Sequence, residues 1–151
     1  MALPLTDTEN VSTFDADGRV LAEDLISALD VPGHDNSSMD GYAVRSADLA
    51  TSDVLQVTQR IPAGSAGHAL EPLAAARIFT GAPIPPGADA VVMQEDTEAS
   101  VDSVSVRLLS APKAGQWIRR RGEDVARGAV VLARGQRLSP ASLGLAASIG
   151  F

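Results

Sequence analysis

Short apolar runs, each closed by glycine, proline, asparagine or aspartate, recur along the whole chain and limit what it can fold into. Runs of this length suit strands, and the turn residues between them leave little room for long helices. In residues 53–61 the side chains expected on one side of a strand, at a period of two, are Leu55, Val57, Gln59 and Ile61. We therefore predict a mainly β protein with a few short helices.

Further strands are predicted wherever an apolar run is bounded by turn residues. The ranges are 76–79, 90–93, 104–108 and 129–132. The segment between the first two, TGAPIPPGAD, contains three prolines, which lack the amide hydrogen that a central strand needs. It is predicted to be a loop.

The clearest helix signal lies at the end of the sequence. Ser139 can cap the first turn, Pro140 occupies the tolerated first position, and Gly150 is suited to end the helix. A shorter helix is predicted at 46–50. Residues 19–28 suit a strand or a helix, and we favour a strand there.

Glycine and proline density divides the chain near His34 and again near Glu123. A length of 151 residues allows one domain or two small ones. We predict that a β-rich lobe, residues 34–123, is inserted into a discontinuous domain of residues 1–33 and 124–151. Because the last residue, Phe151, is apolar and directly follows the predicted helix, we expect a partial boundary there.

Composition excludes several classes of function. A formal charge of −7 disfavours a nucleic-acid surface, since no net positive field attracts phosphate. The absence of cysteine excludes disulfides and thiolate metal sites. The sequence has neither a secretory signal nor an apolar run long enough to span a bilayer, so we expect a cytoplasmic protein without membrane contact.

The loop VPGHDNSSMDGYAV, residues 31–44, is the richest cluster of polar groups. It gathers the oxygens of Asp35, Ser37 and Asp40 with several backbone amides, as a cation or phosphate site requires. The alternative is a set of turns in which these side chains bond their own backbone, and residues alone favour that alternative.

Two other segments carry candidate groups. Thr80 and Gly81 follow a strand and could contact an anion, although a type II turn explains them equally well. In QWIRRRGED, residues 116–124, strand alternation would place Arg119 and Arg121 on one face, suited to phosphate or carboxylate; a solvated charge ladder is the alternative. The two histidines, His34 and His68, are expected to be structural.

Three long motifs occur together and in order: DNSSMDGYAV, TGAPIPPGADAVVMQE and RRRGED. In this combination the chain resembles the molybdopterin molybdenumtransferase family, which includes MoeA and the gephyrin E-domain, over about residues 11–151. The resemblance implies the amino-terminal part of a molybdenum insertase. In the family, a β-rich lobe is inserted into an elongated dimerisation domain, and a molybdopterin-binding α/β domain and a carboxy-terminal β-barrel lie elsewhere.

The resemblance also implies an activity. Family members transfer molybdate to adenylylated molybdopterin, releasing AMP, with help from Mg²⁺. By motif position, Asp40 is the candidate catalytic and metal-binding carboxylate, and Thr80 a candidate catalytic contact on the substrate side. Ser37, Gly81, Arg119 and Arg121 are candidate ligand contacts.

The resemblance further implies a homodimer in which the lobe of one subunit closes the site of its partner. A chain limited to these two domains is expected to be inactive alone. The alternatives are a structural module that serves dimerisation or partner binding, and a relative that handles tungstate. The sequence does not distinguish molybdate from tungstate.

Overall fold

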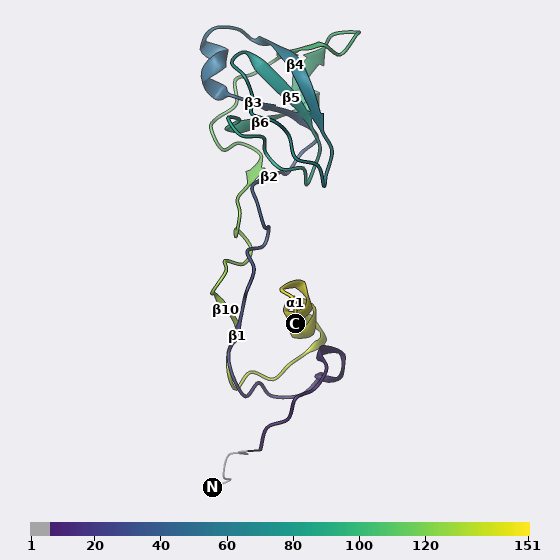
Figure 1. The fold of residues 1–151 in the computed structure, drawn as a ribbon, viewed down its shortest axis with the longest axis vertical. Coiled ribbons are helices and arrows are strands. Elements are labelled where there is room, and N and C mark those ends of the chain that lie inside the picture. The colour runs from purple at the N-terminus through teal and green to yellow at the C-terminus, as the bar shows by residue number, and fades with distance from the viewer. Residues whose placement is uncertain (1–6) are drawn as a thin grey trace. The chain divides into compact units, whose positions relative to one another are not determined.

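A computed structural model describes residues 7–151, which divide between two compact units (Figure 1). One unit, which we call the outer unit, comprises, of the described residues, 7–33 and 122–151. The other, which we call the inserted lobe, comprises His34–Arg121. The inserted lobe is therefore one continuous stretch of sequence between the two segments of the outer unit.

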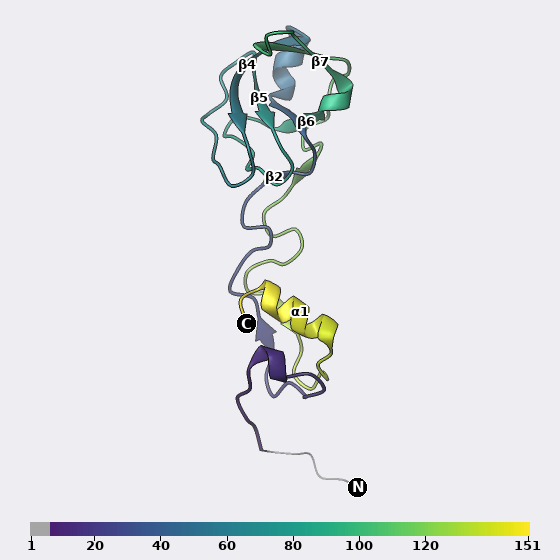
Figure 2. The ribbon, with the colours of Figure 1, turned by 90° about the vertical axis from the view of Figure 1, so that its right-hand side faces the viewer.

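The inserted lobe is built around one sheet of six strands. Its elements are β2 (Asn36–Ser37), β3 (Gly41–Val44), the 3-10 helix η2 (Ser46–Ala50), β4 (Val54–Ile61), β5 (Ala74–Ile78), β6 (Ala90–Met93), the 3-10 helix η3 (Gln94–Asp96), β7 (Thr97–Ala99), β8 (Ser105–Leu108) and β9 (Ile118–Arg119). The sheet has the order β6-β3-β5-β4-β8-β7, and β2 pairs separately with β9 (Figure 2). Only β4 and β5 are parallel neighbours in it.

Side chains on the two faces of this sheet form separate cores. Face 1 carries Tyr42, Val44, Leu55, Ala75, Ala90, Val92, Val106 and Leu108. Face 2 carries Ala43, Ile61, Leu70, Ala74, Ala76, Ile78, Ala82 and Val91. Because both faces are covered, β3, β5 and β6 read as almost continuous apolar runs instead of alternating ones.

The prediction that Leu55, Val57, Gln59 and Ile61 share one side of β4 is wrong. The register to β5 shifts between Val57, which pairs with Ala75, and Gln59, which pairs with Ala76. This β-bulge leaves Thr58 unpaired and reverses the alternation beyond it. Leu55 and Val57 therefore pack on face 1, and Ile61 packs on face 2.

The other predicted strands agree closely with the structure. Residues 90–93 form β6, residues 104–108 contain β8, and the strand predicted at 76–79 begins earlier, at Ala74. The proline-rich segment 80–89 forms a loop, as predicted. The short helix predicted at 46–50 is the 3-10 helix η2.

Gly41 allows β3 and β6 to approach closely. A Cβ atom added there would lie 1.9 Å from the carbonyl oxygen of Val92 and 3.1 Å from the Cα of Met93. Both contacts are with backbone, so no side-chain rotation would relieve them. The glycine that follows Asp40 is thus required by the sheet itself.

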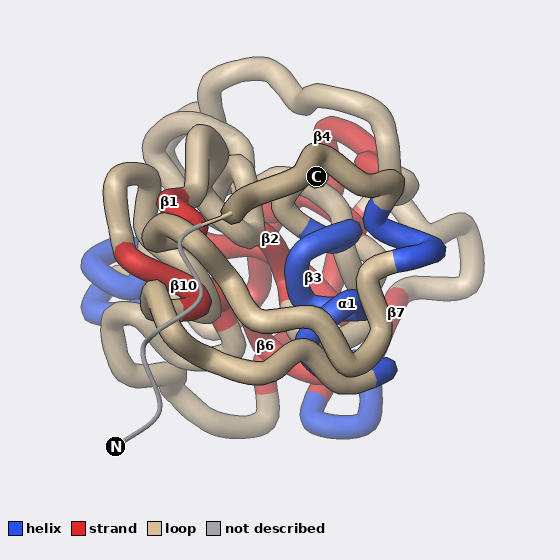
Figure 3. Tube along the Cα trace, turned by 90° about the horizontal axis from the view of Figure 1, so that it is seen from below, coloured by secondary structure: helices blue, strands red, loops and turns tan. Residues whose placement is uncertain are grey.

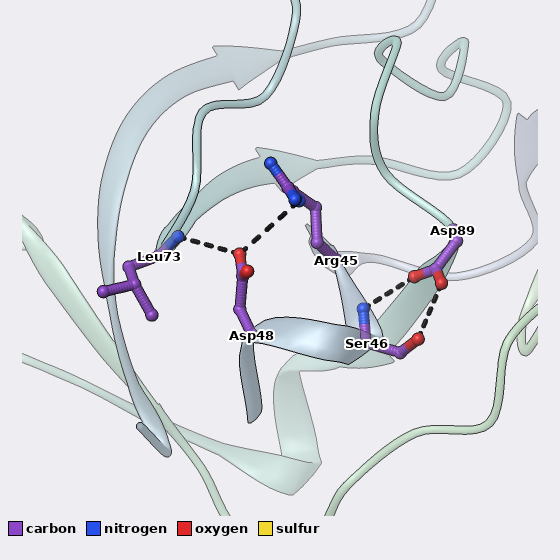
Figure 4. A network of polar contacts seen from close by, with 5 residues as sticks. All are labelled: Arg45, Ser46, Asp48, Leu73 and Asp89. Carbon is purple, nitrogen blue, oxygen red and sulfur yellow. Dashed lines mark hydrogen bonds and ion pairs between the residues drawn. The ribbon is translucent and has the colours of Figure 1, made fainter. Parts of the chain in front are cut away.

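Carboxylates fix the loops at one end of the lobe (Figure 4). The buried Asp48 side chain accepts a hydrogen bond of 2.8 Å from the amide of Leu73, a residue whose φ is +58°. Its carboxylate also lies 3.7 Å from the Arg45 Nε. Asp89 accepts bonds from the amide and the hydroxyl of Ser46, at 2.7 and 2.6 Å. These contacts join η2 to the segments before β5 and β6.

The outer unit contains few regular elements: the 3-10 helix η1 (Thr13–Asp15), β1 (Leu25–Ile26), β10 (Val130–Leu132) and α1 (Pro140–Ser148). Figure 3 shows how much of the described chain is loop between such short elements. Of the strand favoured at 19–28, only β1 is regular, and it pairs with β10. The strand predicted at 129–132 contains β10.

The predicted carboxy-terminal helix is α1. Its first turn is capped by the Ser139 hydroxyl, which accepts from the Ser142 amide at 3.3 Å, and Pro140 is its first residue. Ala146 packs in the core of the outer unit with Ala16, Leu132 and Leu138. Across residues 7–151, none of the helices has the length and apolar character needed to cross a bilayer.

Candidate functional site

The three polar motifs of the sequence meet around β2. On one side of this strand, the Gly81 amide donates to the Ser37 carbonyl at 2.8 Å, and the Ser37 amide donates to the Ala82 carbonyl at 2.9 Å. On the other side, Asn36 pairs with Arg119 and Ser37 with Ile118. Two residues of the first motif therefore hold the TGAP loop and the arginine run in fixed positions.

Asp40 and Thr80 are in direct contact. The Asp40 Oδ1 atom accepts two hydrogen bonds of 2.8 Å, one from the Thr80 amide and one from its hydroxyl. Both residues are exposed. Among the described residues none donates to Asp40 Oδ2, so this oxygen keeps its capacity to accept from a ligand.

These contacts keep the Asp40 carboxylate charged. The hydrogen bond from the Thr80 amide lowers the pKa of Asp40 most, and the Thr80 hydroxyl and the positive charge of Arg77 lower it further. A carboxylate that stays ionised below its ordinary pKa can hold a cation or orient a donor, but it is a poor general acid. Thr80 thus positions a carboxylate that is negatively charged at neutral pH.

Ser37 lies beneath the site. It is 1% exposed, and its hydroxyl donates to the Met39 carbonyl at 2.6 Å and accepts from the Met39 amide at 3.3 Å. This is the local turn that the alternative interpretation of the loop described. Gly81 is exposed with φ +80°, a conformation that favours glycine. Direct ligand contacts by Ser37 and Gly81 stay predictions.

The arginine run is anchored to the first motif through Asp35. The Arg120 guanidinium forms an ion pair of 2.6 Å with Asp35 Oδ2, and the Arg121 amide donates to Oδ1 at 2.8 Å. The bond from the Arg121 amide is the main reason that the pKa of Asp35 is lowered. The Arg120 side chain thus forms an ion pair with this loop, in addition to the backbone contacts that Arg119 and Arg121 make with it. The roles proposed for Arg119 and Arg121 stay predictions.

Arg77, which sequence reasoning missed, supports the same site. Its Nη1 donates to the Gly41 carbonyl at 2.8 Å, and its Nη2 donates to Gln94 Oε1 at 2.6 Å. Gln94 in turn donates its amide to the Asp40 carbonyl at 3.0 Å. The sequence signal for a role of Arg77 was that it is the one charged residue within the otherwise apolar strand AAARI.

A magnesium site would be only partly supplied by these residues. Asp40 offers one carboxylate oxygen at the surface, and no group of three or more His, Cys, Asp or Glu side chains gathers in residues 7–151. Mg²⁺ commonly takes one or two carboxylates and completes its shell with water and substrate phosphate. Asp40 fits the role of one such ligand.

Comparison with known proteins identifies the family. The model of the MoeA N-terminal region (domain I and II) matches residues 1–150. The chain belongs to the MoeA family. The matched residues include parts of both units.

Individual relatives support the same family assignment. The chain is 49% identical over 141 residues to molybdopterin molybdenumtransferase 2 of Mycobacterium tuberculosis (strain H37Rv), covering 89% of this chain and 34% of that protein. It is 47% identical to the molybdopterin molybdenumtransferase of Haemophilus influenzae, covering 96% and 36%. The chain therefore spans about a third of the length of these relatives.

A solved structure has the same fold. The molybdopterin biosynthesis moeA protein from Pyrococcus horikoshii OT3 superposes with a TM-score of 0.89 at 36% identity, covering 97% of this chain and 40% of that one. The expectation of a mainly β, MoeA-like fold is confirmed.

Proposed function

We propose that this chain supplies the Asp40 and Thr80 edge of a molybdenum insertase site. In that reaction molybdate is transferred to adenylylated molybdopterin, and AMP is released. The observation that carries the proposal is the exposed Asp40 carboxylate, whose pKa Thr80 lowers through two hydrogen bonds to a single oxygen, Oδ1. The conversion itself needs groups that bind pterin and nucleotide, so the described residues alone are expected to be inactive.

The role proposed for Asp40 is electrostatic. Its free oxygen would hold one position of a Mg²⁺ ion, which would offset negative charge as the anionic molybdate meets the adenylate phosphate. Thr80 orients Asp40, and the amide of Gly81 lies beside it in the same loop. Ser37 would serve by fixing that loop, and Arg119 and Arg121 would add positive charge for an anionic substrate.

A structural role for the same pair is the second candidate. The two bonds between Thr80 and Asp40 also join the loop before β3 to the loop after β5, whether or not a ligand binds. In that case the charge of Asp40 would be irrelevant, and only its ability to accept hydrogen bonds would matter. A substitution that keeps the hydrogen-bond acceptor and removes the charge distinguishes the catalytic role from the structural one.

Asp40→Asn is that substitution, because an amide oxygen can still accept from Thr80. It is best tested in a chimera in which this chain replaces the corresponding third of the Haemophilus influenzae relative, with molybdenum cofactor formation as the assay. We expect Asp40→Asn to lower the rate by about 100-fold or more, as removal of a catalytic group does. Asp53→Asn, at an exposed position of the same lobe, is the matched control.

The outcomes are distinct. Equal rates for Asp40→Asn and Asp53→Asn would remove the catalytic proposal and favour the structural one. A loss with Thr80→Val that Thr80→Ser restores would assign the effect to the hydroxyl. Loss of folded chimera in Asp40→Asn but not in Asp53→Asn would contradict the claim that an asparagine preserves the loop contact.

We further propose that the outer unit forms a homodimer. Ile26 and Val130 are paired across β1 and β10, and their exposed fractions are 50% and 52%. An apolar cross-strand pair at the surface favours association. Sedimentation of this chain should give a dimer that Ile26→Lys dissociates; a concentration-independent monomer would refute it. A cytoplasmic location stays a prediction, and a relative that handles tungstate stays an alternative.

A further inference from the structure

A shallow pocket of about 300 Å³ lies on face 1 of the six-stranded sheet, at the bulge in β4. Its lining residues are Tyr42, Val57, Thr58, Gln59, Arg60, Arg77 and Ser103. Two of them carry a positive charge and none carries a negative one. Such a lining is unusual in a chain with a formal charge of −7.

The bulge is the reason that the two arginines are neighbours. Beyond Thr58 the register pairs Arg60 directly with Arg77 across the parallel strands β4 and β5. Without the extra residue, strict alternation from Leu55 would turn Arg60 to face 2. The irregularity therefore places Arg60 and Arg77 at paired positions on one face of the sheet.

Like charges opposite each other destabilise a sheet, and this pair is only partly compensated. Both guanidiniums lie over the ring of Phe79, with distances from Cζ to the ring centroid of 4.5 Å for Arg60 and 4.6 Å for Arg77. Arg77 also lies 5.3 Å from the ring of Tyr42. Aromatic rings attract a cation through their faces but leave its charge in place.

Neither arginine forms an ion pair with a carboxylate of the described residues. Arg77 is held in place by the neutral oxygens of Gly41 and Gln94. Arg60 is exposed, and its guanidinium stacks on the ring of Phe79. The pair thus combines a guanidinium held by hydrogen bonds with an exposed one, and the hydroxyl-bearing residues Thr58 and Ser103 line the same pocket.

We propose that Arg60 and Arg77 form a binding site for a phosphate-like tetrahedral oxyanion. Guanidinium groups offer planar pairs of donors that match the oxygens of such an anion, and two of them suit a doubly charged one. The hydroxyls of Thr58 and Ser103 add donors at the wall of the pocket. The site needs neither Asp40 nor Thr80 for its chemistry, so it goes beyond the function proposed above.

The test uses inorganic phosphate and the 151-residue chain. In a titration followed by amide chemical shifts, with ionic strength held constant by sodium chloride, we expect saturable shifts at residues 58–61, 77 and 103. Half-saturation is expected near 1 to 10 mM, as for a small exposed anion site with few contacts. Acetate at equal ionic strength should bind at least about fivefold more weakly.

Variants decide whether the arginine pair is responsible. Arg60→Gln should weaken phosphate binding at least about fivefold. Arg107→Gln, on β8 of the same sheet, removes the same charge from another exposed position and should leave binding unchanged. Linear shifts without saturation, equal binding of acetate, or equal effects of the two variants would each overturn the proposal.

Discussion

Replacing Gly41 by alanine should strongly destabilise the inserted lobe. The added Cβ would lie 1.9 Å from the Val92 carbonyl oxygen. The shortest comfortable contact between a carbon and a carbonyl oxygen is about 3.3 Å, so the backbone of β6 would have to withdraw by roughly 1.4 Å. Such a movement breaks part of the β3–β6 ladder, which pairs Gly41, Tyr42, Ala43 and Val44 with the four residues of β6.

The size of the effect follows from these terms. Each lost ladder hydrogen bond costs about 1 kcal/mol, and overpacking a tight site costs about 1–3 kcal/mol more. We expect the free energy of unfolding of the lobe to fall by at least about 3 kcal/mol. Urea denaturation followed by the fluorescence of Trp117, the one tryptophan of the sequence and part of the lobe, measures it. With a slope of about 1–2 kcal/mol/M, the midpoint should fall by about 1.5–3 M.

Gly64→Ala is the matched control in the same lobe. Its added methyl group meets nothing within 4 Å, but its φ of +81° imposes backbone strain on alanine. That strain costs about 1–2 kcal/mol. If Gly41→Ala lowered the midpoint no more than Gly64→Ala does, the clash with Val92 would not control stability, and the argument from the close approach of β3 and β6 would be refuted.

Two carboxylates lead to further predictions. Asp48→Ala leaves the Leu73 amide without its acceptor and should lower the free energy of unfolding by about 1–3 kcal/mol in the urea assay. Asp53→Ala, at an exposed ion pair, should change this free energy by less than about 0.5 kcal/mol. Equal effects of the two variants would contradict the role of the buried hydrogen bond. Because the folded pKa of Asp40 is below its ordinary value of 3.8, its contribution to stability is complete above that value and is lost as the pH falls through the folded pKa. Thr80→Val removes the hydroxyl bond but keeps the amide bond, so an NMR titration should show the pKa of Asp40 rising only part of the way, and no rise would exclude the hydroxyl as a cause.

Neighbouring residues were enough to predict some elements of the fold but not others. Helix α1 could be predicted because Ser139 and Pro140 are neighbours in sequence and act within one turn. The bulge in β4 could not, because nothing about Thr58 itself marks it. A bulge exists only relative to a partner strand, and β5 begins at Ala74, sixteen residues later.

The candidate site shows the same limit. Family resemblance singled out Asp40 and Thr80, but the residues themselves gave no reason for the two to touch across 40 positions of sequence. The turn formed by the Ser37 hydroxyl, by contrast, is local, and the residues of the loop indicated such a turn. Arg77 was overlooked because its contacts with Gly41 and Gln94 depend on long-range pairing of β5 with β3.

The pairing of β2 with β9 means that the first and last strands of the inserted lobe leave it as neighbours, about 4.8 Å apart. In the outer unit, Val31 and Val125 are likewise joined by an antiparallel bridge. A segment whose two ends already meet can be removed, lengthened or exchanged between relatives without rerouting the polypeptide that carries it. Evolution can therefore alter the loops of the inserted lobe, including those that carry Asp40 and Thr80, without changing the path of the chain in the outer unit.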